Sequence, residues 1–152
     1  MSKRMLHLWI RAEQRKNEKR VGITPLDASK LLSAGIKVTV EDSADRIIPI
    51  EEYNKVGCEI AKEHGWPSAP KNTIILGLKE LPKYTEIIEH KHIMFGHAFK
   101  GQICGLELLK KFKAGKGVLY DLEYLTDPEG RRLAAFGYWA GFSGAAVSLK
   151  AC

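Results

Sequence analysis

The sequence alternates between short apolar segments and longer segments with helical spacing, and this order limits the fold more than any other feature. Residues 5–10, 36–42 and 73–78 are short apolar segments of the kind that form buried β-strands. Because helical segments separate them, consecutive strands cannot be joined by tight hairpins and are expected to lie parallel. We therefore predict an α/β fold with three layers, α/β/α, around a mostly parallel, Rossmann-like (flavodoxin-like) sheet.

The helix predicted for residues 23–35 has the clearest boundaries, since Thr24 stands at the capping position and Pro25 at the first helical position. Further helices are predicted for residues 49–57, 83–90, 101–117 and 137–149, and further strands for residues 58–60, 92–99 and 117–125. Residues 126–132 have the composition of a tight turn, and residues 131–137 are expected to form a returning strand. The sequence thus predicts a terminal antiparallel hairpin.

Charge and composition exclude several classes of protein. The 152 residues carry a formal net charge of +6, but acidic residues are interleaved with the basic ones, and no pattern of stacking aromatic residues accompanies them. Nucleic acid is therefore not an expected partner, whereas a basic cleft for an anionic small molecule fits as well as a generic basic surface. No apolar run approaches the roughly 18 residues of a membrane span, and the apolar part of the N-terminus is too short for a signal peptide.

The cysteines point to a reducing compartment. Cys58, Cys104 and Cys152 are scattered and odd in number, which favours neither a disulfide framework nor a metal site. We therefore expect a cytoplasmic location. No phosphate-binding glycine motif is present either, so the sequence by itself shows no nucleotide site.

Polar side chains gather at the expected carboxyl ends of the strands, where ligands bind in open α/β sheets. Lys79 follows the strand at 73–78, and His97 lies near the end of the strand at 92–99. Histidine titrates near neutrality, and cationic neighbours or partial burial lower the pKa of a lysine toward that range. Together the two can act as general acid and base. The same edge is expected to hold Arg11, Glu13, Arg20, Glu80, Lys100, Gln102 and Glu123.

Plainer interpretations stay open at this point. Lys79 also fits a solvated loop lysine, and His97 fits a core histidine whose hydrogen bonds are satisfied. A metal site built from His90, His92 and His97 exists only on paper, because no cysteine or aspartate completes it. No metal is predicted.

Several stretches, in this order, resemble one known family: LWIRAEQRKNEKRVGITP, KVTVEDS, IILGLKELP, IMFGHAFKGQ and LYDLEYLTDPEGRRLAAFGYWAGFSGAA. They are similar to the N-terminal part of the NAD-dependent, lysine-forming saccharopine dehydrogenases, and the resemblance covers nearly the whole chain. GLKELP and GRRLAAFGYWAG are its most specific motifs. Alanine dehydrogenase, the NAD-binding subunit of transhydrogenase and the lysine–ketoglutarate reductase half of a bifunctional enzyme resemble it more distantly.

The resemblance implies a role for each matching residue. Lys79 falls on the catalytic base of the family and His97 on its proton donor, while Arg20 and Arg132 match positions that bind substrate carboxylates. It further implies substrate contacts at Lys79, Gln102 and Phe136, a cofactor contact at Arg131, and supporting charges at Glu80, Lys100 and Glu123. The substrate class fits, since saccharopine carries three carboxylates and arginine forks bind carboxylates well.

The resemblance also implies how the chain is organised. Family members are more than twice this long, and their second half holds the NAD-binding Rossmann domain. Residues 1–137 are thus expected to form a substrate-side domain and residues 138–152 the start of an interdomain linker helix. The cofactor is NAD, with its main site expected outside this sequence, so the isolated chain is expected to be inactive. The full-length protein is expected to be a monomer that acts on saccharopine, or on lysine and 2-oxoglutarate in reverse.

Two alternatives remain open. One is a non-catalytic domain that binds a dicarboxylate or self-associates through its last helix. The other is an enzyme of the lysine–ketoglutarate reductase or alanine dehydrogenase type, with the same architecture and a different substrate.

Overall fold

The computed structural model describes residues 5–82, 85–99, 101 and 103–151. The chain divides into two compact units, Met1–Asp121 and Leu122–Cys152. The first unit contains the whole sheet, and the second contains the last helix and the segment that leads into it. Each unit is described by itself below.

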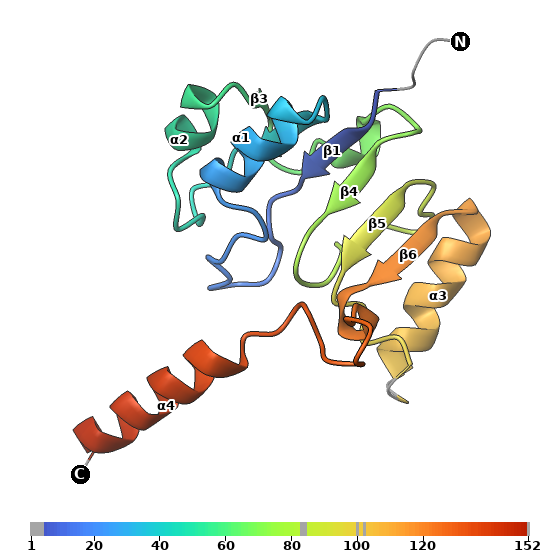
Figure 1. The fold of residues 1–152 in the computed structure, drawn as a ribbon. Coiled ribbons are helices and arrows are strands. Elements are labelled where there is room, and N and C mark those ends of the chain that lie inside the picture. Colours follow the sequence, from blue (N-terminus) through green and yellow to red (C-terminus); the bar gives the residue numbers. More distant parts are fainter. Residues whose placement is uncertain (1–4, 83–84, 100, 102, 152) are drawn as a thin grey trace. The chain divides into compact units, whose positions relative to one another are not determined.

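Six parallel strands form one sheet (Figure 1). They are β1 (His7–Ile10), β2 (Lys37–Glu41), β3 (Glu59–Ala61), β4 (Ile74–Leu76), β5 (Lys91–Met94) and β6 (Val118–Asp121). Their order is β3-β2-β1-β4-β5-β6, and Leu8 of β1 lies opposite both Val38 and Ile74. The chain therefore builds the sheet outward from β1 in one direction, then returns to build the other half. This confirms the predicted α/β fold, with the strand order of doubly wound dinucleotide-binding sheets.

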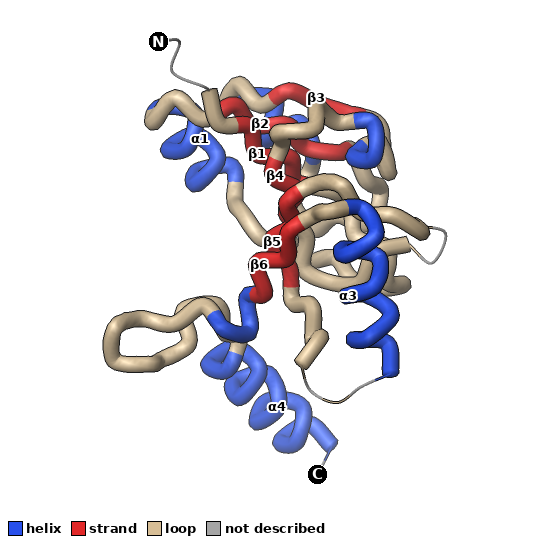
Figure 2. Tube along the Cα trace, turned by 90° about the vertical axis from the view of Figure 1, so that its right-hand side faces the viewer, coloured by secondary structure: helices blue, strands red, loops and turns tan. Residues whose placement is uncertain are grey.

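Helices cover both faces of this sheet. Helix α1 (Pro25–Ser33) lies on one face and helix α3 (Ile103–Gly115) on the other (Figure 2). Helix α2 (Ile50–Lys55) packs in the same apolar cluster as α1. The predicted three-layer arrangement is therefore confirmed.

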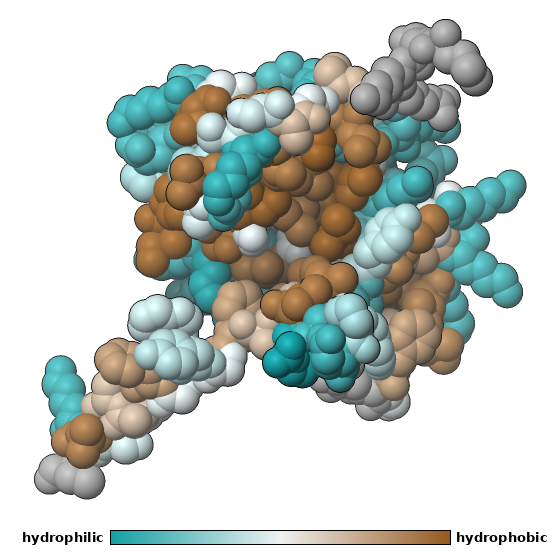
Figure 3. Space-filling view, in the orientation of Figure 1, coloured by the Kyte–Doolittle hydropathy of each residue, from teal (hydrophilic) through white to brown (hydrophobic). Residues whose placement is uncertain are grey.

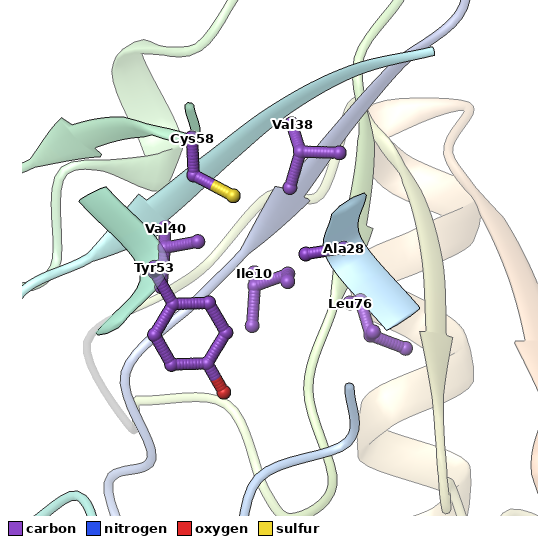
Figure 4. Packing of buried hydrophobic residues seen from close by; sticks show 7 residues of the cluster. All are labelled: Ile10, Ala28, Val38, Val40, Tyr53, Cys58 and Leu76. Atoms are coloured by element: carbon purple, nitrogen blue, oxygen red, sulfur yellow. The ribbon is translucent and has the colours of Figure 1, made fainter. Parts of the chain in front are cut away.

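The larger apolar core lies between the sheet and α1 and α2. Ile10 and Val40 of the strands meet Ala28 of α1 and Tyr53 of α2, and all four are almost fully buried (Figure 4). The hydroxyl of Tyr53 donates to the carbonyl oxygen of Ile23 at 2.6 Å, so its one polar group is satisfied inside the core. A smaller cluster on the opposite face consists of Trp66, Ala69 and Ile75, with Trp9 and Leu81 against it.

The boundaries of α1 agree with the sequence signals. The hydroxyl oxygen of Thr24 accepts a hydrogen bond from the backbone N–H of Asp27 at 3.3 Å, and Pro25 begins the helix. Gly35 follows the helix with a φ of 79°, a left-handed conformation that favours glycine.

The helix predicted for residues 83–90 is wrong for the residues that the structure describes there, 85–90, while residues 83–84 lie outside the described part. Ile88 is fully buried, and its backbone N–H donates to the carbonyl oxygen of Lys111 in α3 at 3.2 Å. Because this long-range bond uses the N–H that a helix would need internally, tertiary contact overrides the weak local preference for a helix.

The predicted terminal hairpin is reduced to a minimal antiparallel pairing. The described residues of the second unit contain one antiparallel bridge, between Thr126 and Arg132, and no returning strand at 131–137. Backbone bonds from Asp127 N–H to the oxygen of Arg131 and from Leu133 N–H to the oxygen of Leu125, both at 2.9 Å, flank this bridge. The side chain of Asp127 accepts from the backbone N–H of Arg131 at 2.7 Å, so that N–H is not available to a longer ladder. The preceding strand also ends early, at Asp121, and a 3₁₀ turn follows over Leu122–Tyr124.

Helix α4 (Gly137–Ala151) confirms the helix predicted from residue 137. It is apolar yet exposed, and the surface of this helix is coloured mainly from white to brown (Figure 3). Its most exposed large side chains are Tyr138, Trp139, Phe142, Val147 and Leu149, with exposed fractions between 62% and 81%. No helix within the described residues combines the length and apolar character needed to cross a bilayer.

Candidate active site

The carboxyl ends of β1 and β4 meet at the point where the chain reverses its direction across the sheet. Ile10 lies opposite Leu76, and the backbone N–H of Arg11 donates to the carbonyl oxygen of Leu76 at 2.9 Å. In doubly wound sheets this reversal opens a crevice for ligands. Here it forms a small hollow with a volume of about 20 Å³, and its polar lining consists of Arg11, Glu13, Glu18, Arg20, Ser43 and Arg46.

Lys79 and His97 lie just beyond the end of the pairing between β4 and β5. Hydrogen bonds continue past the strands, from the backbone N–H of Gly77 to the oxygen of Ile93 at 3.1 Å and from that of Phe95 to the oxygen of Leu78 at 3.3 Å. Lys79 directly follows Leu78, and His97 lies two residues after Phe95. The structure thus brings both half-buried residues to the same edge of the sheet.

The backbone at Lys79 is held by a carboxylate from the neighbouring strand end. Oε1 of Glu13 accepts from the backbone N–H of Leu78 at 2.6 Å, and Oε2 accepts from that of Lys79 at 2.9 Å. One carboxylate therefore binds two consecutive amides, a strong, charge-assisted arrangement.

Arg11 also binds the backbone at Lys79. Its side chain is almost fully buried, and its guanidinium donates to the carbonyl oxygens of Ala12, at 3.1 Å, and of Lys79. It also pairs with Glu13 at 3.5 Å. Burial lowers the pKa of Arg11, while the negative charge of Glu13 opposes that shift.

Arg20 is oriented by Glu18 at the rim of the hollow. The buried carboxylate of Glu18 accepts from Nε of Arg20 at 2.8 Å, from Nη2 at 2.5 Å and from the backbone N–H at 3.1 Å. Hydrogen bonding by Arg20 lowers the pKa of Glu18, and the charge of Lys79 acts in the same direction. The same bond raises the pKa of Arg20. The charges of Arg20 and Lys79 therefore both act on the carboxylate of Glu18.

His97 has an unusual backbone. Its φ is 48°, in the left-handed region that residues other than glycine rarely adopt. Its ring stacks on that of Phe95, with centroids 6.4 Å apart and planes at 22°. Such strain costs on the order of 1 kcal/mol and is common at functional sites. The conformation turns the chain sharply just where the candidate proton donor stands.

His90, which directly precedes β5, and His92, within β5, are core residues. Nε2 of His90 donates to the carbonyl oxygen of Ala69 at 3.0 Å, and the ring of His92 packs edge-on against Trp66 and Phe112. Burial lowers the pKa of His92 to about 3, so its ring is neutral in the folded protein. Among the described residues, no three potential ligands from His, Cys, Asp and Glu are grouped as a metal site requires.

Glu80 is exposed and lies beside the lysine without joining the hollow. Its carboxylate pairs with Arg15, including a bond from Nε to Oε2 at 3.1 Å. Lys100 and Gln102, which the sequence also assigned to this edge, lie outside the described residues.

The remaining candidates belong to the second unit. Nη2 of Arg132 donates to Glu123 at 3.2 Å and to the carbonyl oxygen of Ala134 at 3.3 Å. Arg131 instead pairs with Asp127 at 2.8 Å. The two adjacent arginines thus bind different carboxylates. Phe136 has an exposed fraction of 43%.

Sequence reasoning missed three contributors to the site. Glu18 and Arg46 were given no place in it, and Glu13 was noted at the edge without a role. The position of Glu13, three residues beyond the central strand, was the available signal. The position of Glu13 in the sequence does not show what it binds. Only the pairing of β1 with β4 brings it to the backbone at Lys79.

Comparisons with known proteins identify the family of this chain. The family described as "Alanine dehydrogenase/PNT, N-terminal domain" matches residues 9–143. Saccharopine dehydrogenase [NAD(+), L-lysine-forming] of Candida albicans is 46% identical over 98% of this chain and 39% of its own length. The protein of the same name from Schizosaccharomyces pombe is 46% identical over 93% and 39%.

A solved L-alanine dehydrogenase structure has a TM-score of 0.64 at 16% identity, over 82% of this chain and 34% of its own, which shows the shared fold. The chain spans about 39% of the length of the two curated relatives named above. Because the family match covers residues 9–143, the chain belongs to the alanine dehydrogenase/PNT N-terminal domain family.

Proposed function

We propose that this chain is the substrate-side, N-terminal part of a saccharopine dehydrogenase, which oxidises saccharopine with NAD and releases lysine and 2-oxoglutarate. The observation that carries the proposal is the 46% identity to enzymes of that name over 98% of the chain. The hollow at the strand reversal supports it, because arginines line it and Glu13 of its lining binds the backbone N–H of Lys79.

In this proposal, residues of the chain bind the substrate and move protons. Arg20 and Arg132 bind carboxylates of saccharopine, and Gln102 and Phe136 make further contacts. After oxidation to the imine, Lys79 takes a proton from the attacking water. His97 then protonates the amine of the departing lysine. Glu80, Lys100 and Glu123 adjust the charge around this pair, and Glu18 keeps the fork of Arg20 oriented.

The described residues do not fit the main site of a dinucleotide. In Rossmann domains a glycine-rich turn after the first strand lets a pyrophosphate approach the backbone. Here β1 is followed by Arg11 and Glu13, whose side chains fill that space and bind the chain at Lys79. We therefore propose that NAD binds mainly to a domain outside these residues and that Arg131 contacts it from the second unit.

The domain assignment follows the same logic. We propose that residues 1–137 act as the substrate-side domain and that residues 138–152 begin the helix that leads to the cofactor domain. The exposed apolar side chains of α4 support this, since such a surface is normally covered in a folded protein. A cytoplasmic location is proposed from the scattered cysteines, and a monomeric state from the family resemblance.

The test is an assay of the full-length protein that contains this sequence. We expect saccharopine to support NADH formation and alanine not to. Lys79→Met and His97→Gln should each lower kcat by about a hundredfold, the usual contribution of a general acid or base. Glu59→Gln is the matched control, because Glu59 pairs with Lys37 at the far end of the sheet. Unchanged turnover in both site variants would refute the residue assignment, and activity with alanine alone would refute the substrate.

A further inference from the structure

We propose that Glu13 is a positioning residue for Lys79: its carboxylate binds the two amides that fix where the lysine leaves the sheet. This inference rests on the proposed function, because the role of Lys79 comes from it. Glu13 itself is not assigned to the chemical step.

The contacts of Glu13 are specific for this task. Its two oxygens accept from the N–H groups of Leu78 and Lys79, at 2.6 Å and 2.9 Å. These amides lie two and three residues beyond Leu76, where β4 ends. With 9% of its side chain exposed, Glu13 makes these bonds away from bulk water, where they are stronger than at a surface.

Arg11 makes the attachment two-sided. Its guanidinium binds the carbonyl oxygen of Lys79 while Glu13 binds the amide of the same residue. Both polar groups of the Lys79 backbone are therefore held by side chains from the end of β1. The backbone carries the Cα of Lys79, so these bonds limit the region that its amine can reach.

Gly77 makes room for this arrangement. A Cβ at residue 77 would fall on the guanidinium of Arg11, which the buried surroundings hold in place. The conformation of Gly77 does not itself require glycine, since its φ is not in the left-handed region. The glycine is therefore explained by the passage of Arg11 beneath the chain toward Lys79.

The surroundings of the Glu13 carboxylate are positively charged. Arg11 pairs with it at 3.5 Å, and the charge of Glu13 contributes to the raised pKa of Arg20. A purely structural role would need no such position beside the hollow. The experiment therefore has to separate loss of folding from loss of the placement of Lys79.

The first test is a double-mutant cycle in the full-length protein. Glu13→Gln keeps the size of the side chain, but its NH₂ group cannot accept one of the two amides. We expect kcat for saccharopine to fall about tenfold, with KM changed less than twofold, because misplacing a catalytic group affects the chemical step most. In the Lys79→Met background the same substitution should cost nothing further. Equal losses in both backgrounds, or full activity of Glu13→Gln, would overturn the proposal.

The second test needs no activity. Amide hydrogen exchange measured on this chain should become at least tenfold faster at Leu78 and Lys79 in Glu13→Gln, and stay unchanged at the same amides in Glu59→Gln. Unchanged exchange in Glu13→Gln would show that the carboxylate does not hold this backbone, whatever the reaction is. Conversely, a full-length protein without saccharopine activity would refute the proposed function, while the exchange rates would still decide whether Glu13 holds Lys79.

Discussion

At the scale of single residues, burial decides what a polar side chain can do. Lys79 and His97 are half-buried at the edge of the sheet, whereas His92 is almost fully enclosed by Trp66 and Phe112. The sequence singles out Lys79 and His97 for proton transfer and offers His92 only for a metal site that nothing completes. In the structure, His92 is held neutral and has no route to a substrate, so its contribution is to packing and to the pH dependence of stability.

His92 leads to a prediction about acid stability. Burial, together with the nearby charge of Arg11, lowers its pKa to about 3. Between that value and the ordinary pKa of about 6.5, the unfolded chain binds a proton that the folded chain does not. Stability therefore falls as the pH falls through this window, by about 2 kcal/mol between pH 7.5 and pH 5 for this group alone. His92→Phe keeps a ring in the same place and should remove that part of the slope.

Urea unfolding at several pH values measures this effect. His64→Asn is the control, because His64 is exposed and asparagine tolerates its left-handed φ of 60°. The control should keep the slope of the parent protein. An identical slope in His92→Phe would mean that the buried ring takes up a proton in the folded state after all.

At the scale of elements, a buried carboxylate joins the ends of strands and turns that the sequence separates. Glu41, the last residue of β2, has no exposed surface. It accepts hydrogen bonds from the indole of Trp9 at 2.9 Å and from the backbone N–H groups of Ala12, His64 and Trp66, at 2.8, 3.0 and 2.7 Å. One side chain thus satisfies donors from β1, the segment after it and the turn that covers the second apolar cluster.

Glu41→Gln should therefore destabilise the protein strongly. The amide NH₂ of glutamine would face N–H donors, and at least one would lose its acceptor inside the core. We expect a loss of about 3 kcal/mol in the free energy of unfolding, the upper range for an unsatisfied buried group. Glu59→Gln, on the exposed edge strand β3, should cost less than about 1 kcal/mol. Equal stability of Glu41→Gln and the parent in urea unfolding would contradict the importance of these bonds.

The elements that were predicted correctly share a simple property: their own residues suffice to define them. Thr24 caps α1 within its first turn. The apolar residues of β2 favour a buried strand whichever strands lie beside it. The segment at 85–90 fails this criterion, because Ile88 bonds to Lys111, which is remote in the sequence. The predicted hairpin stops at a single bridge, where the side chain of Asp127 accepts from the backbone N–H of Arg131.

At the scale of the whole molecule, the main unexplained surface is that of α4. Its large apolar side chains are mostly exposed, from 62% at Phe142 to 81% at Leu149. We expect the isolated chain to self-associate through this helix, and Trp139→Lys with Leu149→Lys to reduce the association. Sedimentation velocity over a range of concentrations measures it. A chain that stays monomeric at every concentration would contradict the prediction.

The unit formed by Met1–Asp121 provides the control for that experiment. It contains the whole sheet, so the lysine substitutions in α4 should leave its unfolding midpoint in urea unchanged. In the longer protein proposed above, the association should disappear, since the rest of the chain would cover α4. A fall of the midpoint in the α4 variants would show that the helix contributes to the sheet domain instead.

The sequence by itself determined the α/β class, the parallel sheet and the edge at which Lys79 and His97 stand. Hydrophobic periodicity and the alternation of strands with helices are both patterns that can be read along the chain. The site depends on the tertiary structure. Only the register between β1 and β4 brings Glu13 to the amides at Lys79, and only packing decides that His92 is enclosed. Strand register and burial are properties of segments that are distant in sequence, so no local pattern contains them. That is the physical reason why the candidate chemistry was visible in the sequence while the structure that holds it was not.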